Sequence, residues 1–336
     1  MALLFMDGFD HYATADIVKK WSVNNGATIE EGTGRRGGNA LKSAAGSGFV
    51  SKTLPFSVGT LICGFAFSPI TAGFSDRNMF ELMDGATLHL ALRHNASTGM
   101  ISVLLGSTVI ATTTTSIAVA SGYAYVEFKA TIHDTTGAYE LRINGVPALS
   151  ASGIDTRNAG NASVNAVRIG NTGTNGHISL FDDFYACDSA GLTNNDFLGD
   201  VRIDTIFPNG AGTHQSWTPS TGTDHAALVD ETAPNTTDYL TGGAAGTKET
   251  LGLQDLSVNG AILGIQVNNA VSKTDAGACT IKNLIRSGSS EASGQTFAPS
   301  TSYLYSSSIH EADPATGAAW LTAAINALEA GAEVVS

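Results

Sequence analysis

Alternation of apolar and polar residues with a period of two recurs through the first half of this sequence, and it restricts the fold more than any other feature. Residues 87–93 and 123–130 alternate in this way. Each such segment is expected to be a strand with one face on a core and the other in water. The apolar run 60–67 indicates a buried strand. Further strands are expected at 101–105, 108–111, 164–170 and 178–186.

The strongest local signal is the pair Asn144-Gly145, which separates residues 139–143 from Val146. Both residue types accept positive φ, as a type I′ turn requires, and that turn matches the twist of paired strands. The sequence therefore predicts a β-hairpin at this position.

Length and composition agree with an all-β chain of two modules. The 336 residues include 38 glycines, only 8 prolines and 14% charged residues, which is typical of short strands joined by tight turns. The turn-rich stretch 191–200 suggests a boundary. We expect two jelly-roll β-sandwich modules, residues 1–190 and residues 191–336.

The second module is expected to contain strands and one helix. Strands are expected at 200–207, closed by a turn at 208–210, and at 261–271, 279–285 and 301–306. Residues 259–270 could make a long edge strand for assembly. A helix is expected within 318–330, because its apolar residues fall on one face and Gly331 supplies a stop. These apolar residues are Trp320, Leu321, Ala324, Ile325 and Leu328.

Charge and apolar patterning exclude two classes of partner. Seventeen basic residues oppose 30 acidic residues, for a formal net charge of −13, so nucleic acid and anionic membranes are not expected to bind. No apolar stretch approaches the 18 residues of a membrane span. The first residues lack a basic region and a long apolar run, so we expect that there is no signal peptide and that the chain assembles in the cytoplasm.

Cys63, Cys187 and Cys279 are far apart and are expected to be buried thiols.

Motifs for catalysis are not found in the sequence. His310-Glu311 lacks the second histidine of a zinc protease motif. Glycoside hydrolases need two carboxylates beside one bond. Asp182 and Asp183 are adjacent, so a regular strand would point them to opposite faces, and Glu127 is the only acidic residue in its strand. We therefore expect no enzymatic activity.

Two acidic clusters remain, at Asp7 and Asp10 and at Asp182 and Asp183. The first and last strands of a sandwich often pair, which would bring the clusters together. Their carboxylate oxygens would then suit calcium, which takes six to eight oxygen ligands. Alternatively, each aspartate accepts hydrogen bonds from turn amides.

Several segments carry a resemblance to known families. Residues 137–146, 167–170 and 178–186 resemble the laminin-G/concanavalin A-like jelly roll, in which a Gly…Leu-x-Ile-Asn-Gly hairpin precedes an Ile-Gly strand and a closing Asp-Asp-Phe-Tyr strand. Residues 182–208 and 313–331 are similar to virion proteins of tailed phages.

The resemblance implies a non-enzymatic structural component of a phage virion, in a tail fibre, tail tip or capsid surface. Other virion proteins, further copies of the chain and host-surface glycans would be its partners. Aromatic side chains would stack on sugar rings, and the candidates are Trp21, Trp217, Tyr303 and Tyr305. A free carbohydrate-binding receptor module and an envelope polysaccharide hydrolase are the alternatives.

Overall fold

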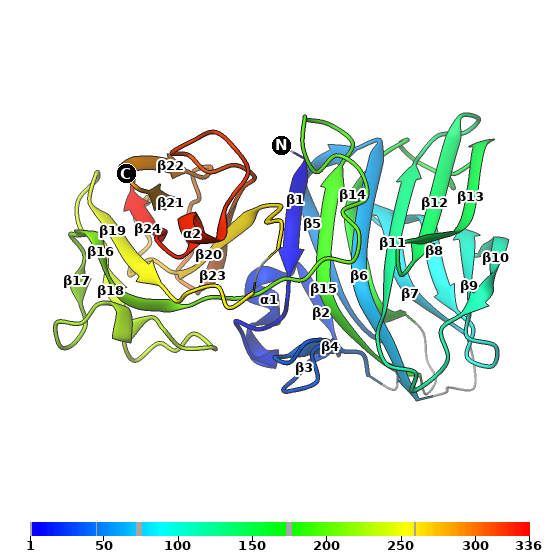
Figure 1. Cartoon of the computed structure of the whole chain (residues 1–336), viewed down its shortest axis with the longest axis horizontal. Helices are drawn as coiled ribbons and strands as arrows, with labels where there is room; N and C mark the ends of the chain where they lie inside the picture. Colours follow the sequence, from blue (N-terminus) through cyan, green and yellow to red (C-terminus); the bar gives the residue numbers. More distant parts are fainter. Residues whose placement is uncertain (1, 45, 72–75, 173–176, 259) are drawn as a thin grey trace. The chain divides into compact units, whose positions relative to one another are not determined.

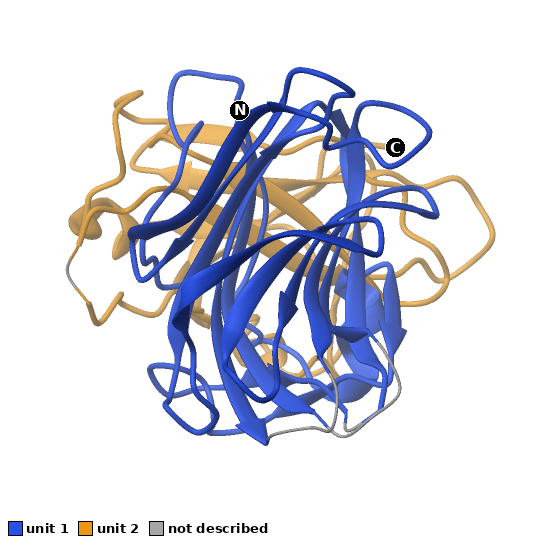
Figure 2. Cartoon of the chain, turned by 90° about the vertical axis from the view of Figure 1, so that its right-hand side faces the viewer, with its two compact units in different colours: residues 1–203 blue, residues 204–336 orange. Residues whose placement is uncertain are grey.

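The computed structural model describes residues 2–44, 46–71, 76–172, 177–258 and 260–336, and it is nearly all β. The chain forms two compact units, Met1–Ile203 (unit 1) and Asp204–Ser336 (unit 2), coloured separately in Figure 2. The all-β prediction is confirmed. Residues 191–203, which the sequence assigned to the second module, belong to unit 1.

Unit 1 is a sandwich of two antiparallel sheets (Figure 1). The first has the order β13-β12-β11-β6-β15-β4-β3, with β1 also paired to β15, and the second has the order β10-β9-β8-β7-β14-β5-β2. The strands are β1 Leu3–Asp7, β2 Val23–Asn25, β3 Thr28–Glu30, β4 Ala40–Lys42, β5 Gly48–Val58, β6 Thr60–Thr71, β7 Arg77–Asp84, β8 Thr87–His94, β9 Met100–Leu105, β10 Thr108–Ser116, β11 Ala124–Thr131, β12 Gly137–Ile143, β13 Val146–Ile154, β14 Val164–Thr172 and β15 Ile178–Asp188. A 3-10 turn, Thr14–Asp16, leads into the one-turn helix α1, Ile17–Lys20.

The predicted hairpin is confirmed. β12 pairs with β13 in antiparallel register, and Ile143 lies opposite Val146. Asn144 and Gly145 have φ of 51° and 77°. Positive φ at both positions is the geometry that selects Asn-Gly.

Aromatic side chains fill the space between the two sheets. Phe65 of β6 contacts Phe80 of β7 and Phe181 of β15, with ring centroids 5.3 and 6.1 Å apart. All three side chains are at most 1% exposed. Because β6 and β7 belong to opposite sheets, these contacts join the two layers. Cys63 and Cys187 are buried, as expected, whereas Cys279 of unit 2 is half-buried.

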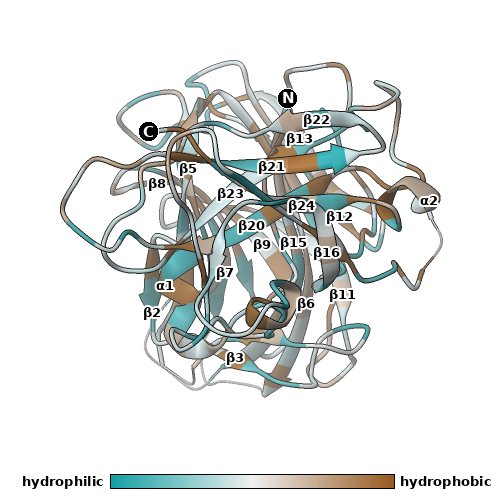
Figure 3. Ribbon diagram, turned by 90° about the vertical axis from the view of Figure 1, so that its left-hand side faces the viewer, coloured by the Kyte–Doolittle hydropathy of each residue, from teal (hydrophilic) through white to brown (hydrophobic). Residues whose placement is uncertain are grey.

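Unit 2 contains a five-stranded antiparallel sheet of order β16-β19-β24-β21-β22 and two two-stranded sheets, β17-β18 and β20-β23. β21 carries both brown and teal segments (Figure 3), and all its residues are buried except Lys282 and Arg286, which are half-buried. The strands are β16 Pro208–Gln215, β17 Thr218–Pro219, β18 Leu240–Thr241, β19 Lys248–Leu253, β20 Ile265–Val271, β21 Ile281–Ser287, β22 Ser290–Ser293, β23 Leu304–His310 and β24 Glu329–Val334. The helical turns are the 3-10 turn Ala226–Leu228 and α2, Thr322–Ile325.

Three predictions for residues 200–336 were wrong in their local detail. The helix expected within 318–330 is reduced to the single turn α2, because residues from Glu329 onward form β24 and pair with both β19 and β21. The apolar residues Trp320, Ile325 and Leu328 are nevertheless buried, in a core cluster with Val267 and Ile285. The apolar residues whose spacing predicted a helix are therefore buried by a one-turn helix and its neighbours, which pack on the sheet.

The strand expected at 200–207 is also absent, and Pro208–Gly210 begins β16 instead of closing a strand. Proline is tolerated there because β16 lies at the sheet edge, where a strand's first residue needs no donor. The long strand expected at 259–270 starts only at Ile265, and Asn259 lies outside the described residues.

Helices within the described ranges are too short to cross a bilayer, since α1 and α2 have four residues each.

Candidate functional site

Pairing of β1 with β15 brings the two acidic clusters of unit 1 together, as the sequence predicted. Asp7 lies opposite Phe184 in the antiparallel register. Asp182 and Asp183 directly precede Phe184, so three acidic residues lie near one end of this strand pair. The loop of residues 34–39 also contacts this end, because Arg35 donates to both Asp182 and Asp183.

The expected opposite orientation of Asp182 and Asp183 was wrong. The Arg35 amide donates to Asp182 Oδ2 at 2.7 Å, and Arg35 Nε donates to Asp183 Oδ2 at 2.8 Å. The register of β15 with β6 shifts between Asp182 and Tyr185, and Asp183 has φ of 50°. A β-bulge of this kind redirects a side chain, so both carboxylates contact the same arginine.

Asp7 is engaged entirely by groups of the protein. Its Oδ1 accepts the amide of Phe9 at 3.0 Å and pairs with Lys20 Nζ at 3.1 Å. Its Oδ2 accepts Tyr12 Oη at 2.6 Å and Trp21 Nε1 at 2.7 Å. Burial alone would raise the pKa of Asp7, but the charge of Lys20 and these hydrogen bonds outweigh it and hold the pKa below its usual value. Asp7 thus anchors the first strand in the core.

Asp182 lacks comparable compensation. It is 5% exposed. Burial, then the charge of Asp183, raises the pKa of Asp182 to about 8, against the hydrogen bonds that it accepts from the amides of Arg35 and Asp183. Arg35 is shared, because its guanidinium also binds Asp200 and the carbonyl of Val201. A second cation would therefore stabilise the ionised form of Asp182.

Oxygen atoms converge beside Gly34 at the same end of the sheet. A side-chain carbon added there would lie no farther than 3.1 Å from Gly37 O, Asn39 O and Asp182 Oδ2. Asp10 Oδ1 accepts the amide of Asn39 at 2.7 Å. Carboxylate and carbonyl oxygens are the donors that calcium takes.

No group of three or more histidine, cysteine or acidic side chains within the described ranges is arranged to hold a metal ion. A cation at Gly34 would therefore rely on Asp10, Asp182 and main-chain oxygens. The metal site stays a prediction, with Asp7 committed to Lys20 and Asp183 to Arg35.

Glu127 of β11 lies on a sheet face that residues 191–203 (the closing segment) cover. Its Oε1 accepts Tyr185 Oη at 2.7 Å and the amide of Gly199 at 2.8 Å. Glu127 is 1% exposed, and among the described residues no donor reaches its Oε2. The Glu127 carboxylate therefore holds the closing segment against the sheet through the amide of Gly199.

Further contacts fasten the closing segment to the neighbouring strands. Asp196 Oδ1 accepts Lys129 Nζ at 3.0 Å, and the guanidinium of Arg142 lies 4.0 Å from the centre of the Phe197 ring. At the other end, Ile203 N donates to Asp183 Oδ1 at 2.7 Å. These partners are side chains and not a strand, which explains why residues 200–203 form no ladder. Sequence reasoning did not predict this arrangement, because it depends on side chains far apart along the chain.

The predicted sugar-binding aromatics lie in different places. Trp21 is 1% exposed and stacks on Phe9 in the core of unit 1, so its proposed role in stacking on sugars was wrong. Trp217, Tyr303 and Tyr305 of unit 2 are half-buried. Trp217 directly precedes β17, whereas Tyr305 lies in β23 of a separate sheet and Tyr303 just before it.

Sequence reasoning missed Tyr239, whose side chain is 41% exposed. It directly precedes β18, the partner of β17. Ser220 N donates to Tyr239 O at 2.9 Å, so Tyr239 lies at one end of the β17–β18 ribbon and Trp217 at the other. Three residue steps separate the ends, which is about 10 Å along a strand, and side chains an odd number of steps apart face opposite sides of the ribbon. One edge of the Trp217 indole lies over Gly242, where an added side-chain carbon would be 3.2 Å from the ring.

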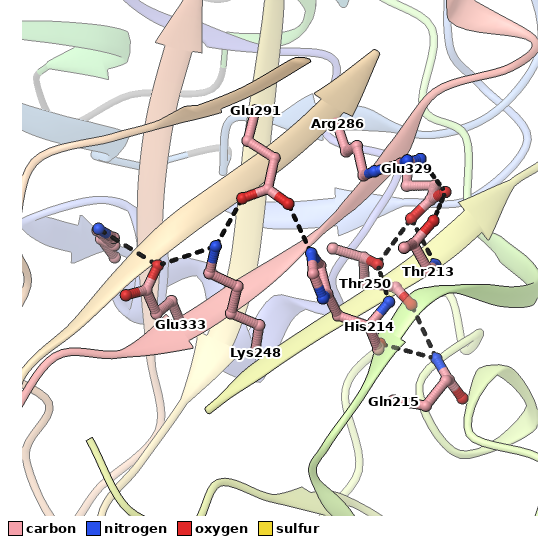
Figure 4. A network of polar contacts seen from close by, with 10 residues as sticks. Thr213, His214, Gln215, Lys248, Thr250, Arg286, Glu291, Glu329 and Glu333 are labelled. Atoms are coloured by element: carbon pink, nitrogen blue, oxygen red, sulfur yellow. Dashed lines mark hydrogen bonds and ion pairs between the residues drawn. The ribbon is translucent and has the colours of Figure 1, made fainter. Parts of the chain in front are cut away.

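A second polar feature of unit 2 is an ion-pair network across the five-stranded sheet (Figure 4). Glu333 of β24 lies between Lys248 and Lys282 of the two neighbouring strands, 3.9 and 3.3 Å from their Nζ atoms. Lys248 Nζ also pairs with Glu291 at 2.6 Å. Hydrogen bonds from Lys248 and His214 hold the pKa of Glu291 below its usual value.

These side chains are 17–30% exposed, so each pair contributes little stability. Their opposite charges alternate across the sheet, which makes this a hydrated polar face without a concentrated charge of one sign.

Comparison with known proteins gives weak structural similarity only. No protein-family model and no curated protein sequence matches the chain. An endo-β-1,4-glucuronan lyase from the fungus Trichoderma reesei is similar over 50% of this chain and 90% of its own, at 15% identity and a TM-score of 0.39. The alginate lyase Aly36B is similar over 55% of this chain and 96% of its own, at 10% identity and a TM-score of 0.40.

The binding domain of Paraclostridial Mosquitocidal Protein 1 is similar over 55% of this chain, at 12% identity and a TM-score of 0.40, and 48% of that chain is covered. Similarities of this strength carry no argument about activity.

Proposed function

We propose that this chain is a non-enzymatic structural protein of a tailed-phage particle, located in a tail fibre, tail tip or capsid surface. It assembles in the host cytoplasm with other virion proteins and with copies of itself.

The observation that carries the proposal is that Glu127 forms hydrogen bonds within unit 1. A hydrolase needs a carboxylate that reaches its substrate, with a second one nearby. Glu127 instead accepts hydrogen bonds from Tyr185 and Gly199 beneath the closing segment. The other candidate, Asp183, is bound to Arg35. Both carboxylates thus hold the fold together, which favours a structural role.

The segments that resemble phage virion proteins support the same interpretation. Residues 182–208 include the closing segment, and residues 313–331 include Trp320, Ile325 and Leu328 of the unit 2 core. The resemblance therefore covers the segment that closes a sheet face of unit 1 and part of the core of unit 2. The net charge of −13 favours solubility and disfavours nucleic acid as a partner.

The test is to purify particles on a density gradient, detect the chain by mass spectrometry and locate it in a density map. We expect a fixed copy number per particle and density packed against other virion proteins. Chain found only in the lysate, and never in particles, would contradict the proposal. Release of oligosaccharides from host polysaccharide by the wild type, and its loss in Glu127→Gln, would contradict the non-enzymatic part.

A second candidate function is glycan binding by unit 2, favoured by Tyr239, a 41% exposed aromatic side chain at one end of the β17–β18 ribbon; Trp217, at the other end, faces the opposite side of the ribbon. Aromatic faces stack on sugar rings. Tyr239→Ala should weaken binding on an array of host-surface glycans, and Trp217→Ala tests the opposite face of the ribbon. Leu321→Ala is the matched control, because Leu321 is a 70% exposed apolar side chain of the same unit. Equal binding by all three variants would reject the ribbon as the site.

A further inference from the structure

The edge strands of unit 1 differ in how they are protected. The strand orders of the two sheets end on β13 and β3 and on β10 and β2. β2 and β3 have three residues each, and β1, which pairs only with β15, has five. Short strands protect a sheet edge from pairing with other chains. β10 and β13 have nine residues each and lack this protection.

These two long edges lie at the same side of the sandwich, where β10 and β13 pack beside each other (Figure 1). We call residues 108–116 and 146–154 the neutral side, because none of them is charged. In a chain with 14% charged residues, about two or three would be expected in segments of this combined length. Charged residues are one of the features that protect exposed edges from pairing.

The neutral side also exposes apolar side chains. Val109, Ile110 and Val146 are 49%, 37% and 65% exposed. The register of β10 with β9 shifts between Val109 and Ala111, so Ile110 is an extra residue. Such a bulge changes the direction of side chains along a strand, and here two consecutive apolar residues both meet solvent.

The main chain of β10 offers hydrogen-bonding groups as well. β10 pairs with β9 on one side, and no strand in the described ranges pairs with its other side. β10 contains no proline, whereas Pro147 interrupts the donors of β13. A second register shift, between Thr112 and Ser116, limits regular pairing to the first half of β10. A partner would therefore combine a short ladder there with side-chain contacts.

We propose that the neutral side is a two-fold self-association surface that binds a second copy of this chain. With a net charge of −13, two copies repel each other across most of their surfaces. The neutral side is where they can meet without bringing like charges together. A two-fold axis through β10 would place β10 antiparallel to its own copy, with Ile110 and threonine hydroxyls facing each other. This surface is defined for the free chain and does not depend on the virion role.

The test is sedimentation equilibrium of the full chain with Ile110→Lys and Val146→Lys. In a two-fold contact each substitution brings two positive charges to one interface, so we expect dissociation to become at least tenfold easier. Phe56→Lys is the matched control, because Phe56 is 51% exposed on β5 of the same unit. Far-UV circular dichroism checks that all variants fold.

A wild-type chain that stays monomeric up to about 0.1 mM would overturn the proposal. A dimer that Ile110→Lys and Val146→Lys leave unchanged would overturn it too. As an independent readout, Ile110→Cys in a Cys279→Ser background should form a disulfide-linked dimer, because a two-fold axis at Ile110 places the two cysteines opposite each other, whereas Phe56→Cys should not. The particle experiment and this solution experiment can fail separately.

Discussion

Replacing Lys20 by methionine tests whether the buried ion pair with Asp7 holds the first strand in unit 1. Methionine keeps the apolar stem and removes the charge. The two side chains are 1% and 0% exposed, and Nζ lies 3.1 Å from Oδ1. Loss of Lys20 leaves the Asp7 carboxylate buried without its ion-pair partner.

Removal of one partner of a buried pair typically costs about 3–5 kcal/mol. Asp7 keeps hydrogen bonds from Phe9, Tyr12 and Trp21, so we expect a loss near the lower end, about 3 kcal/mol at pH 7. The loss should shrink as the pH falls toward 4. The pKa of Asp7 is held down in part by Lys20, so without it the carboxyl can take up a proton more readily.

The assay is urea unfolding followed by fluorescence, with hydrogen exchange of the β1 and β15 peptides to assign the change to unit 1. Lys42→Met is the control, because the Lys42–Glu30 pair has a similar distance, 3.0 Å, but side chains that are 31% and 40% exposed. Its expected cost is at most about 1 kcal/mol. Equal costs for the two variants would refute the reasoning. In the double variant Asp7→Asn/Lys20→Met, part of the loss should be recovered.

Three further predictions concern unit 1. Calcium at about 100 times its dissociation constant should stabilise the chain by about 2.7 kcal/mol and raise its Tm. Asp182→Asn should abolish this rise. Asp196→Asn is the control and should keep it, because the Asp196 side chain is 64% exposed. Glu127→Ala should cost about 1–3 kcal/mol in urea unfolding and Glu127→Gln less, because alanine leaves the buried Tyr185 hydroxyl without its acceptor; equal losses would contradict this. Burial lowers the pKa of His177 to about 4, so unfolding free energy should fall as the pH drops from about 6.5 to about 4, since the unfolded state binds the proton first. His177→Phe should flatten that pH dependence, and an unchanged slope would assign it to other groups.

Local features of the fold could be predicted because their causes are local. The Asn144-Gly145 turn follows from the positive φ that these residues accept. Alternation along 87–93 placed β8, and the apolar run 60–67 placed part of β6. The approach of the two acidic clusters also followed from the pairing of the first and last strands.

The details of the candidate site could not be predicted, because they depend on contacts between distant residues. Asp182 and Asp183 contact one arginine only because a bulge interrupts β15 opposite β6. Trp21 was an apolar residue without periodic context, and its burial against Asp7 and Phe9 depends on the folded N-terminal segment. Glu127 acquired its role from Gly199, which lies 72 residues away along the chain.

The sequence by itself determined that this is an all-β chain, where many of its strands lie and which turn closes the hairpin at Asn144. The reason is that side-chain periodicity and the φ preferences of turn residues act over a few neighbours. Tertiary structure alone decided that residues 329–334 extend as β24, that residues 191–203 close a sheet face, and that Asp7 pairs with Lys20. Each of these outcomes depends on which distant group satisfies a main-chain or charged atom, and periodicity carries no information about that choice.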